Sequence, residues 1–193
     1  KSTTYFSGDE ISRFQMQLIA GKDINTLCCK AVRRSCVDSF IDYSEWKYVA
    51  NGEDSFQSLP ILDAVKSICY IPKTGYFYRR DNMSMSKHYR AKDFESFMCV
   101  YKRTLEYANR WGVSSDVLKQ VNCRYANLLS VVIHQARKGI SKEDYHAFLK
   151  AISKNNLFNE LCNSVHVDNW YQKIFFTLLS HGRIELLPVF MEV

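Results

Sequence analysis

Apolar residues recur at helical spacing through most of the second half of the chain, and this pattern limits the possible folds more than any other feature. Such one-sided periodicity is typical of helices that bury one stripe of side chains against their neighbours. Two long faces are formed in this way, one by Phe94, Phe97, Met98, Tyr101, Leu105 and Ala108, and one by Val117, Val121, Tyr125, Leu128, Leu129, Val132 and Ala136.

Signals for helix starts and ends divide this half of the chain further. Ser114 or Ser115 can cap the second long helix and Gly139 can close it, while Ser141 and Asp144 have the spacing of a capping box. The pattern predicts a bundle of four or five helices over residues 91–193. The last of them is marked by Trp170, Ile174 and Leu178, ahead of Gly182.

The first ninety residues mix short helical and strand-like segments. The patterns predict helices over residues 9–20 and 53–65, and short strands over 27–32, 68–71 and 75–78. The full chain of 193 residues is 47% hydrophobic, which suffices for a substantial core. We therefore predict a mainly α fold with a small β component, divided by composition into residues 1–90 and 91–193.

Two adjacent carboxylates, Glu53 and Asp54, follow Gly52 and open the helix predicted over residues 53–65. Acidic residues in a first turn are stabilised by the positive end of the helix dipole, so a capping role explains them without any chemistry. A carboxylate held at a helix start is also a suitable general base. Residue types alone leave both interpretations open.

Several short motifs occur in a characteristic order around this acidic pair. They are Asn25 and Lys30 followed by the basic pair Arg33-Arg34, then Gly52-Glu53-Asp54, then Ser67-Ile68-Cys69-Tyr70-Ile71-Pro72, and then Tyr76-Phe77-Tyr78-Arg79 trailed by Ser84 and Ser86. Over residues 8 to 90 the chain resembles the acceptor-side portion of family 2 glycosyltransferases, enzymes of the GT-A fold. The resemblance implies a partial GT-A-type α/β region ahead of the C-terminal helical bundle.

The resemblance also implies roles for single residues. Asp54 would be the base that deprotonates an acceptor hydroxyl in an inverting transfer, with Glu53 beside it, and the substrate would meet Asn25, Lys30, Gly52, Tyr78 and Arg79. The charged members have an alternative role as solvated tips of side chains whose stems cover apolar surface. Tyr78 could stack on a sugar ring, but aromatic residues of strands are more often core residues.

The family holds its nucleotide-sugar donor and a divalent cation, Mg or Mn, through an Asp-x-Asp motif, and no Asp-x-Asp occurs in this chain. We therefore expect a fragment that has no metal or cofactor of its own and is inactive alone. In the complete enzyme the partners would be a nucleotide sugar and a glycan or lipid-linked acceptor. By resemblance, the setting is bacterial surface polysaccharide synthesis in the cytoplasm, at or near the inner face of the membrane.

The net charge of +6 is concentrated in residues 73–92, which contain six basic residues and one acidic residue. An alternative function is a helical interaction module that binds nucleic acid or protein through this basic, aromatic segment. A third possibility is a structural bundle with an apolar docking face. No nucleic-acid-binding motif is present, so a nucleic acid partner is not expected, whereas contact with anionic lipid is.

The seven cysteines are odd in number, scattered, and contain no Cys-x-x-Cys pair. Reduced and mostly buried thiols are predicted, with no metal site. Cys28 and Cys29 are adjacent within the strand predicted over residues 27–32, and their side chains should then point to opposite faces.

Overall fold

The computed structural model describes residues 2–22, 24–37, 44, 49, 51–77, 89–165 and 170–187. Within these residues the fold is mainly helical with one small sheet, as predicted. The elements in chain order are β1 (Thr4–Ser7), α1 (Glu10–Ile19), the 3-10 turn η1 (Arg34–Cys36), α2 (Glu53–Ala64), β2 (Ser67–Tyr70), α3 (Asp93–Arg110), α4 (Ser115–Gly139), α5 (Lys142–Ile152), α6 (Asn156–Ser164), α7 (Trp170–Ser180) and the 3-10 turn η4 (Ile184–Leu186).

The second half of the chain is the predicted helical bundle, and its caps explain where the helices begin. Ser114 accepts a hydrogen bond from the backbone N–H of Val117 at the start of α4. At the start of α5, Ser141 accepts from the N–H of Asp144 and donates to its carboxylate. A cap of this kind typically contributes about 1 kcal/mol.

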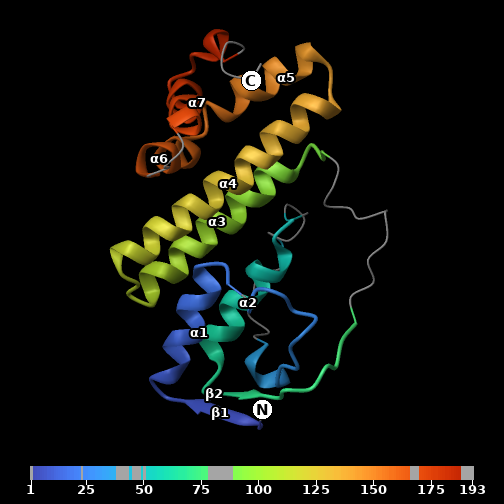
Figure 1. Ribbon diagram of the computed structural model, residues 1–193, viewed down its shortest axis with the longest axis vertical. Helices are drawn as coiled ribbons and strands as arrows, with labels where there is room; N and C mark the ends of the chain where they lie inside the picture. The colour runs from blue at the N-terminus through green and yellow to red at the C-terminus, as the bar shows by residue number, and fades with distance from the viewer. Residues whose placement is uncertain are drawn as a thin grey trace.

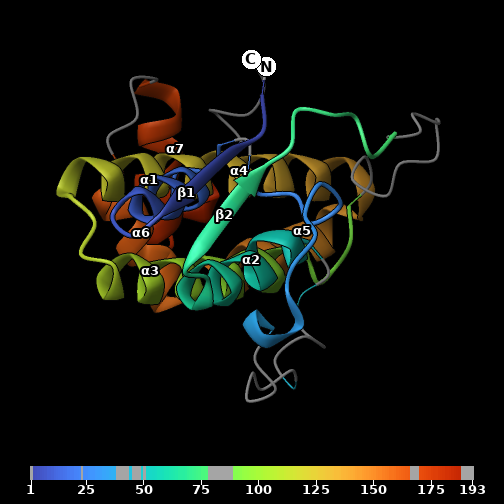
Figure 2. The same cartoon turned by 90° about the horizontal axis from the view of Figure 1, so that it is seen from below.

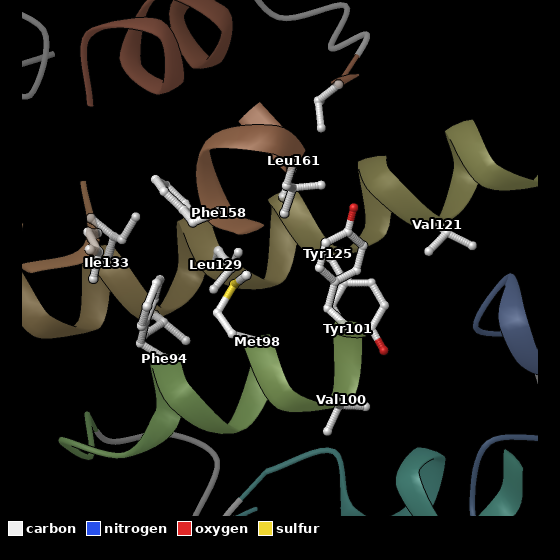
Figure 3. Close-up of a cluster of buried hydrophobic side chains, with 14 of the residues drawn as sticks. Phe94, Met98, Val100, Tyr101, Val121, Tyr125, Leu129, Ile133, Phe158 and Leu161 are labelled. Carbon is white, nitrogen blue, oxygen red and sulfur yellow. The ribbon is translucent and has the colours of Figure 1, made fainter. Parts of the chain in front are cut away.

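Helices α3 and α4 lie against each other across the middle of the molecule, with α5, α6 and α7 on one side and α1, α2 and the sheet on the other (Figure 1). Buried side chains of α3, α4 and α6 interdigitate in the layer shown in Figure 3. The layer contains Phe94, Met98 and Tyr101 from α3, Tyr125, Leu129 and Ile133 from α4, and Phe158 and Leu161 from α6.

Helix α2 packs on α3 and on α1, and polar contacts fix where its C-terminal end lies. The Asp63 carboxylate accepts hydrogen bonds from the Arg110 guanidinium at 2.6 Å and from the Trp111 indole N–H at 2.7 Å. Both donors lie at the C-terminal end of α3. The ends of the two helices are therefore held side by side, which orients the whole of α2, including its N-terminal turn.

The sheet consists of β1 and β2, which pair antiparallel with Phe6 opposite Ile68. Figure 2 shows it lying across the end of the molecule that α1 and α2 form. The strand predicted over residues 68–71 is confirmed as β2, but β1 was not predicted. Its inward-facing side chain is Phe6, whose ring contacts Phe14 of α1 edge-on, with the ring centroids 4.9 Å apart.

Two predicted strands were wrong. Residues 27–32 form a turn followed by irregular chain. In the other predicted strand, residues 75–77 are irregular, and Tyr78 lies outside the described residues. Phe77 is 85% exposed, so this segment lacks the half-buried environment that favours a strand. In the described part of the chain, no helix has the length and apolar character needed to cross a membrane.

Candidate functional site

Gly52 ends the loop before α2 and is the N-cap residue of that helix. Its φ of +81° lies in the left-handed region, which glycine adopts without steric cost. A side chain at this position would also bring its Cβ within 3.2 Å of Val100 on α3. In Figure 3, Val100 points away from the other labelled core residues, toward the side on which α2 lies. The glycine therefore lets the start of α2 approach α3 closely.

A buried carboxylate fixes the residue before this glycine. Asp93, only 1% exposed at the start of α3, accepts hydrogen bonds from the Asn51 side-chain amide at 2.7 Å and from the Arg90 guanidinium at 3.1 Å. A buried charge is tolerated when it is paired and hydrogen-bonded in this way. Asp93 therefore helps to set where the Gly52-Glu53-Asp54 segment begins, a role that sequence reasoning missed because the two residues are 42 positions apart.

The loop over residues 24–30 forms the other side of the site, and two serines of α2 form hydrogen bonds to it. The Ser55 hydroxyl donates to the Asn25 side-chain oxygen at 3.1 Å, and Ser58 accepts from the Lys30 ammonium at 3.3 Å. Both serines are buried. Their spacing of three residues places them on one face of the helix, next to each other. Sequence reasoning missed them, because this spacing shows that two residues share a helix face but not that the face is buried.

Lys30 is held by its own loop. Its ammonium group donates to the backbone carbonyls of Ile24 and Thr26, each at 2.5 Å, in addition to Ser58. An ammonium has three hydrogens, so these three contacts engage all of them. The bonds fold the chain back on itself, and this is why residues 27–32 turn instead of extending as a strand.

The positive charge of Lys30 nevertheless interacts with the carboxylate of Asp54. Burial lowers the pKa of its amine, while the negative charge of Asp54 acts against that shift and favours the charged form. Asp54 also acts on the thiol of Cys28 in the same loop, whose pKa is raised mainly by loss of hydration and by the adjacent Cys29. The acidic turn of α2 and the loop over residues 24–30 thus share one electrostatic environment.

The two carboxylates that open α2 differ from the other acidic groups around them. Glu53 is exposed and Asp54 is partly exposed. Unlike Asp63 and Asp93, neither has a hydrogen-bonded or ion-paired side-chain partner among the residues that the structure describes. With respect to the described residues, Asp54 therefore has free acceptor positions at a fixed point of the backbone, where it interacts with the charge of Lys30.

The structure brings together five of the seven residues proposed for the site, Asn25, Lys30, Gly52, Glu53 and Asp54, although 22 to 29 positions separate the first two from the last three. Tyr78 and Arg79 lie outside the described residues. No family model, curated protein or solved structure matches this chain. The arrangement at the start of α2 must therefore be interpreted from its own chemistry.

Two other features do not contribute to this site. A hollow of about 690 Å³ lies between α5 and the turn after α7, lined among others by His146, Lys150 and His181, on the opposite side of α3 and α4 from α2 (Figure 1). Within the described ranges, His, Cys, Asp and Glu side chains nowhere gather in a group of three or more suited to a metal ion. The described residues at the start of α2 form no such group either.

The basic segment over residues 73–92 is described only at its ends. There, Arg90 is engaged with the buried Asp93 and serves to position the start of α3. Arg79, Arg80 and Lys87, on which the nucleic-acid alternative depends, lie outside the described residues.

Replacing Lys30 by methionine should destabilise the protein, because hydrogen bonds from a charged group contribute about 1.5–3 kcal/mol and the carbonyls of Ile24 and Thr26 would lose their donor. We expect the free energy of unfolding in urea to fall by about that amount. Lys66→Met is the matched control, since Lys66 is exposed and should change stability by less than about 0.5 kcal/mol. Equal stability of the two variants would contradict the role given to the Lys30 ammonium.

Proposed function

We propose that this chain is the acceptor-side portion of an inverting glycosyltransferase, in which Asp54 accepts the proton of the attacking hydroxyl. The observation that carries the proposal is the position and accessibility of the Asp54 carboxylate. Its carboxylate is partly exposed, fixed in the first turn of α2, and without a hydrogen-bonded partner among the described residues. A general base needs these properties, because a carboxylate already engaged by a guanidinium or by amides is a weaker acceptor.

The surrounding residues support the same assignment. The segment before α2 is anchored by Asp93 and Asn51, and the loop bearing Asn25 is anchored by Ser55. Catalysis by positioning requires such rigid supports, since a small displacement of a base costs much of its effect. Glu53, exposed beside the base, is placed to accept hydrogen bonds from other hydroxyls of a sugar acceptor.

Chemically, the attacking acceptor oxygen forms a bond to the anomeric carbon as the bond to the nucleoside diphosphate breaks. The proton of the acceptor hydroxyl passes to Asp54, and the electron pair of the breaking bond leaves with the diphosphate. The proposed substrates are a nucleotide sugar and a glycan or lipid-linked acceptor, in the synthesis of surface polysaccharide at the inner face of a membrane. The sequence motifs support this choice of substrates, and the geometry supports the base.

The proposal predicts how this chain should behave alone. Without an Asp-x-Asp motif, the 193 residues should bind no uridine diphosphate sugar tightly, even with manganese present. Isothermal titration calorimetry with uridine diphosphate glucose and its N-acetylglucosamine analogue should give no measurable heat of binding at low micromolar ligand. A longer version that includes the upstream coding sequence should bind one of a panel of nucleotide sugars. Micromolar affinity of the present chain would show that the donor site lies within it.

A further inference from the structure

The two adjacent cysteines lie together at the tip of a turn. Leu27 to Lys30 form this turn, which is closed by a 2.9 Å hydrogen bond from the Lys30 N–H to the Leu27 carbonyl. Cys28 and Cys29 are its two central residues, and both are exposed. Their sulfur atoms are 4.0 Å apart, on the same side of the chain. The prediction that the two thiols point to opposite faces was wrong, because the segment is a turn.

The thiols of this protein are also less buried than predicted. None of the seven cysteines forms a disulfide, but Cys28, Cys29 and Cys69 are exposed and the other four are partly exposed. Within the described residues, Cys28 and Cys29 are the pair whose sulfur atoms lie in contact. An exposed pair of thiols at this separation is a chemically distinct feature, because both sulfurs can bind one atom at the same time.

A disulfide is not the natural product of this pair. The peptide bond between the two residues is trans, and trans neighbours have their Cα atoms about 3.8 Å apart. Disulfides usually join residues whose Cα atoms are about 4.4–6.8 Å apart. Closing a bond between adjacent cysteines therefore requires distortion of the turn, and the Lys30 ammonium, bonded to Ile24 and Thr26, holds that turn in place.

A bridging atom suits the pair better. With bonds of about 2.3 Å to each sulfur, as in zinc thiolates, two sulfurs 4.0 Å apart subtend an angle of about 120° at the atom between them. A trivalent, pyramidal atom takes a narrower angle, so the two exposed side chains would rotate to bring their sulfurs closer together. Thiolates are soft ligands and select soft, thiophilic elements. The described residues supply no third protein ligand, so the bound element should be satisfied by two sulfurs together with a group that it brings itself.

We propose that Cys28 and Cys29 form a two-thiol binding site for a thiophilic element that takes two sulfur ligands, of which an organic trivalent arsenical is the chemical type. With an arsenoxide, two arsenic–sulfur bonds form as the arsenic–oxygen bond breaks. The two thiol protons leave with the oxygen as water, and arsenic stays trivalent throughout. The two thiols lie in the same loop as Asn25 and Lys30, but their reaction with the arsenical does not involve sugar transfer and does not depend on the proposed function.

Phenylarsine oxide is the probe that tests the site. Mass spectrometry of the intact, reduced protein should show one phenylarsenic adduct with loss of one water, resistant to a monothiol and removed by a dithiol. Because the second sulfur binds intramolecularly, losing it should weaken binding about 10²–10⁴-fold. Cys28→Ser and Cys29→Ser should each show this loss. Cys69→Ser, which removes an exposed single thiol, should bind as the unaltered protein does.

The outcomes separate the proposal from its alternatives. Retention of the adduct in both Cys28→Ser and Cys29→Ser, or its loss in Cys69→Ser, would place the site elsewhere and overturn the proposal, as would the absence of any adduct. Because the substituted positions are exposed, both serine variants should unfold within about 0.5 kcal/mol of the unaltered protein. Urea unfolding of each variant checks that binding, and not folding, has changed.

Discussion

Replacing Asp54 by asparagine in the complete enzyme is expected to reduce sugar transfer about 10²–10⁴-fold, the range contributed by a positioned general base. Asparagine keeps the size and shape of the side chain but does not accept the proton of the acceptor hydroxyl. Stability should change by no more than about 1 kcal/mol, the upper range for a charge near an exposed helix N-terminus. Release of nucleoside diphosphate in the presence of acceptor measures the first quantity, and urea unfolding measures the second.

Asp116 offers the matched control for this experiment. It is also an aspartate in the first turn of a helix, α4, but it is exposed and pairs at 3.0 Å with Lys119, three residues later in the same helix. Asp116→Asn should leave transfer unchanged. If Asp54→Asn retains more than about a tenth of the original rate, its carboxylate is a helix-capping charge and the base must be sought elsewhere. Such a result would leave the two-thiol site untouched.

Truncating Phe158 to alanine should cause the largest loss of stability. Phe158 is fully buried on α6, and its ring contacts those of Phe94 on α3 and Phe176 on α7 edge-on, with ring centroids 5.7 Å and 6.3 Å away. Removing such a ring leaves a cavity and typically costs about 3–5 kcal/mol. For a chain of this size the melting temperature should fall by about 6–20 °C. Thermal unfolding followed by circular dichroism measures this shift.

The same substitution at an exposed position shows whether burial is the cause. Phe77 is 85% exposed, and Phe77→Ala should alter stability by less than about 0.5 kcal/mol. If Phe158→Ala fails to fold, Phe158→Leu keeps most of the buried volume and should show an intermediate loss. Similar melting temperatures for Phe158→Ala and Phe77→Ala would mean that the contact between α3, α6 and α7 contributes little to stability.

The candidate site was only partly predictable. The sequence placed Glu53 and Asp54 at the start of a helix because a glycine followed by acids is a local signal. It did not reveal that Asp93 is buried against Asn51, or that Ser55 and Ser58 receive the loop over residues 24–30. These contacts join segments about 30 to 40 positions apart, and their residue types are equally common on exposed surfaces.

The helices are what the sequence by itself determined. The spacing of apolar residues and the serine caps are local signals that extend over only a few helical turns. The starts of α4 and α5 could therefore be predicted from Ser114 and Ser141. The strands were decided by tertiary structure. β1 is four residues long and exists because β2, some sixty positions later, lies beside it. Residues 27–32 are apolar enough for a strand, yet the Lys30 ammonium folds them into a turn and brings two thiols together, since three hydrogen bonds to a charged group outweigh a weak local preference.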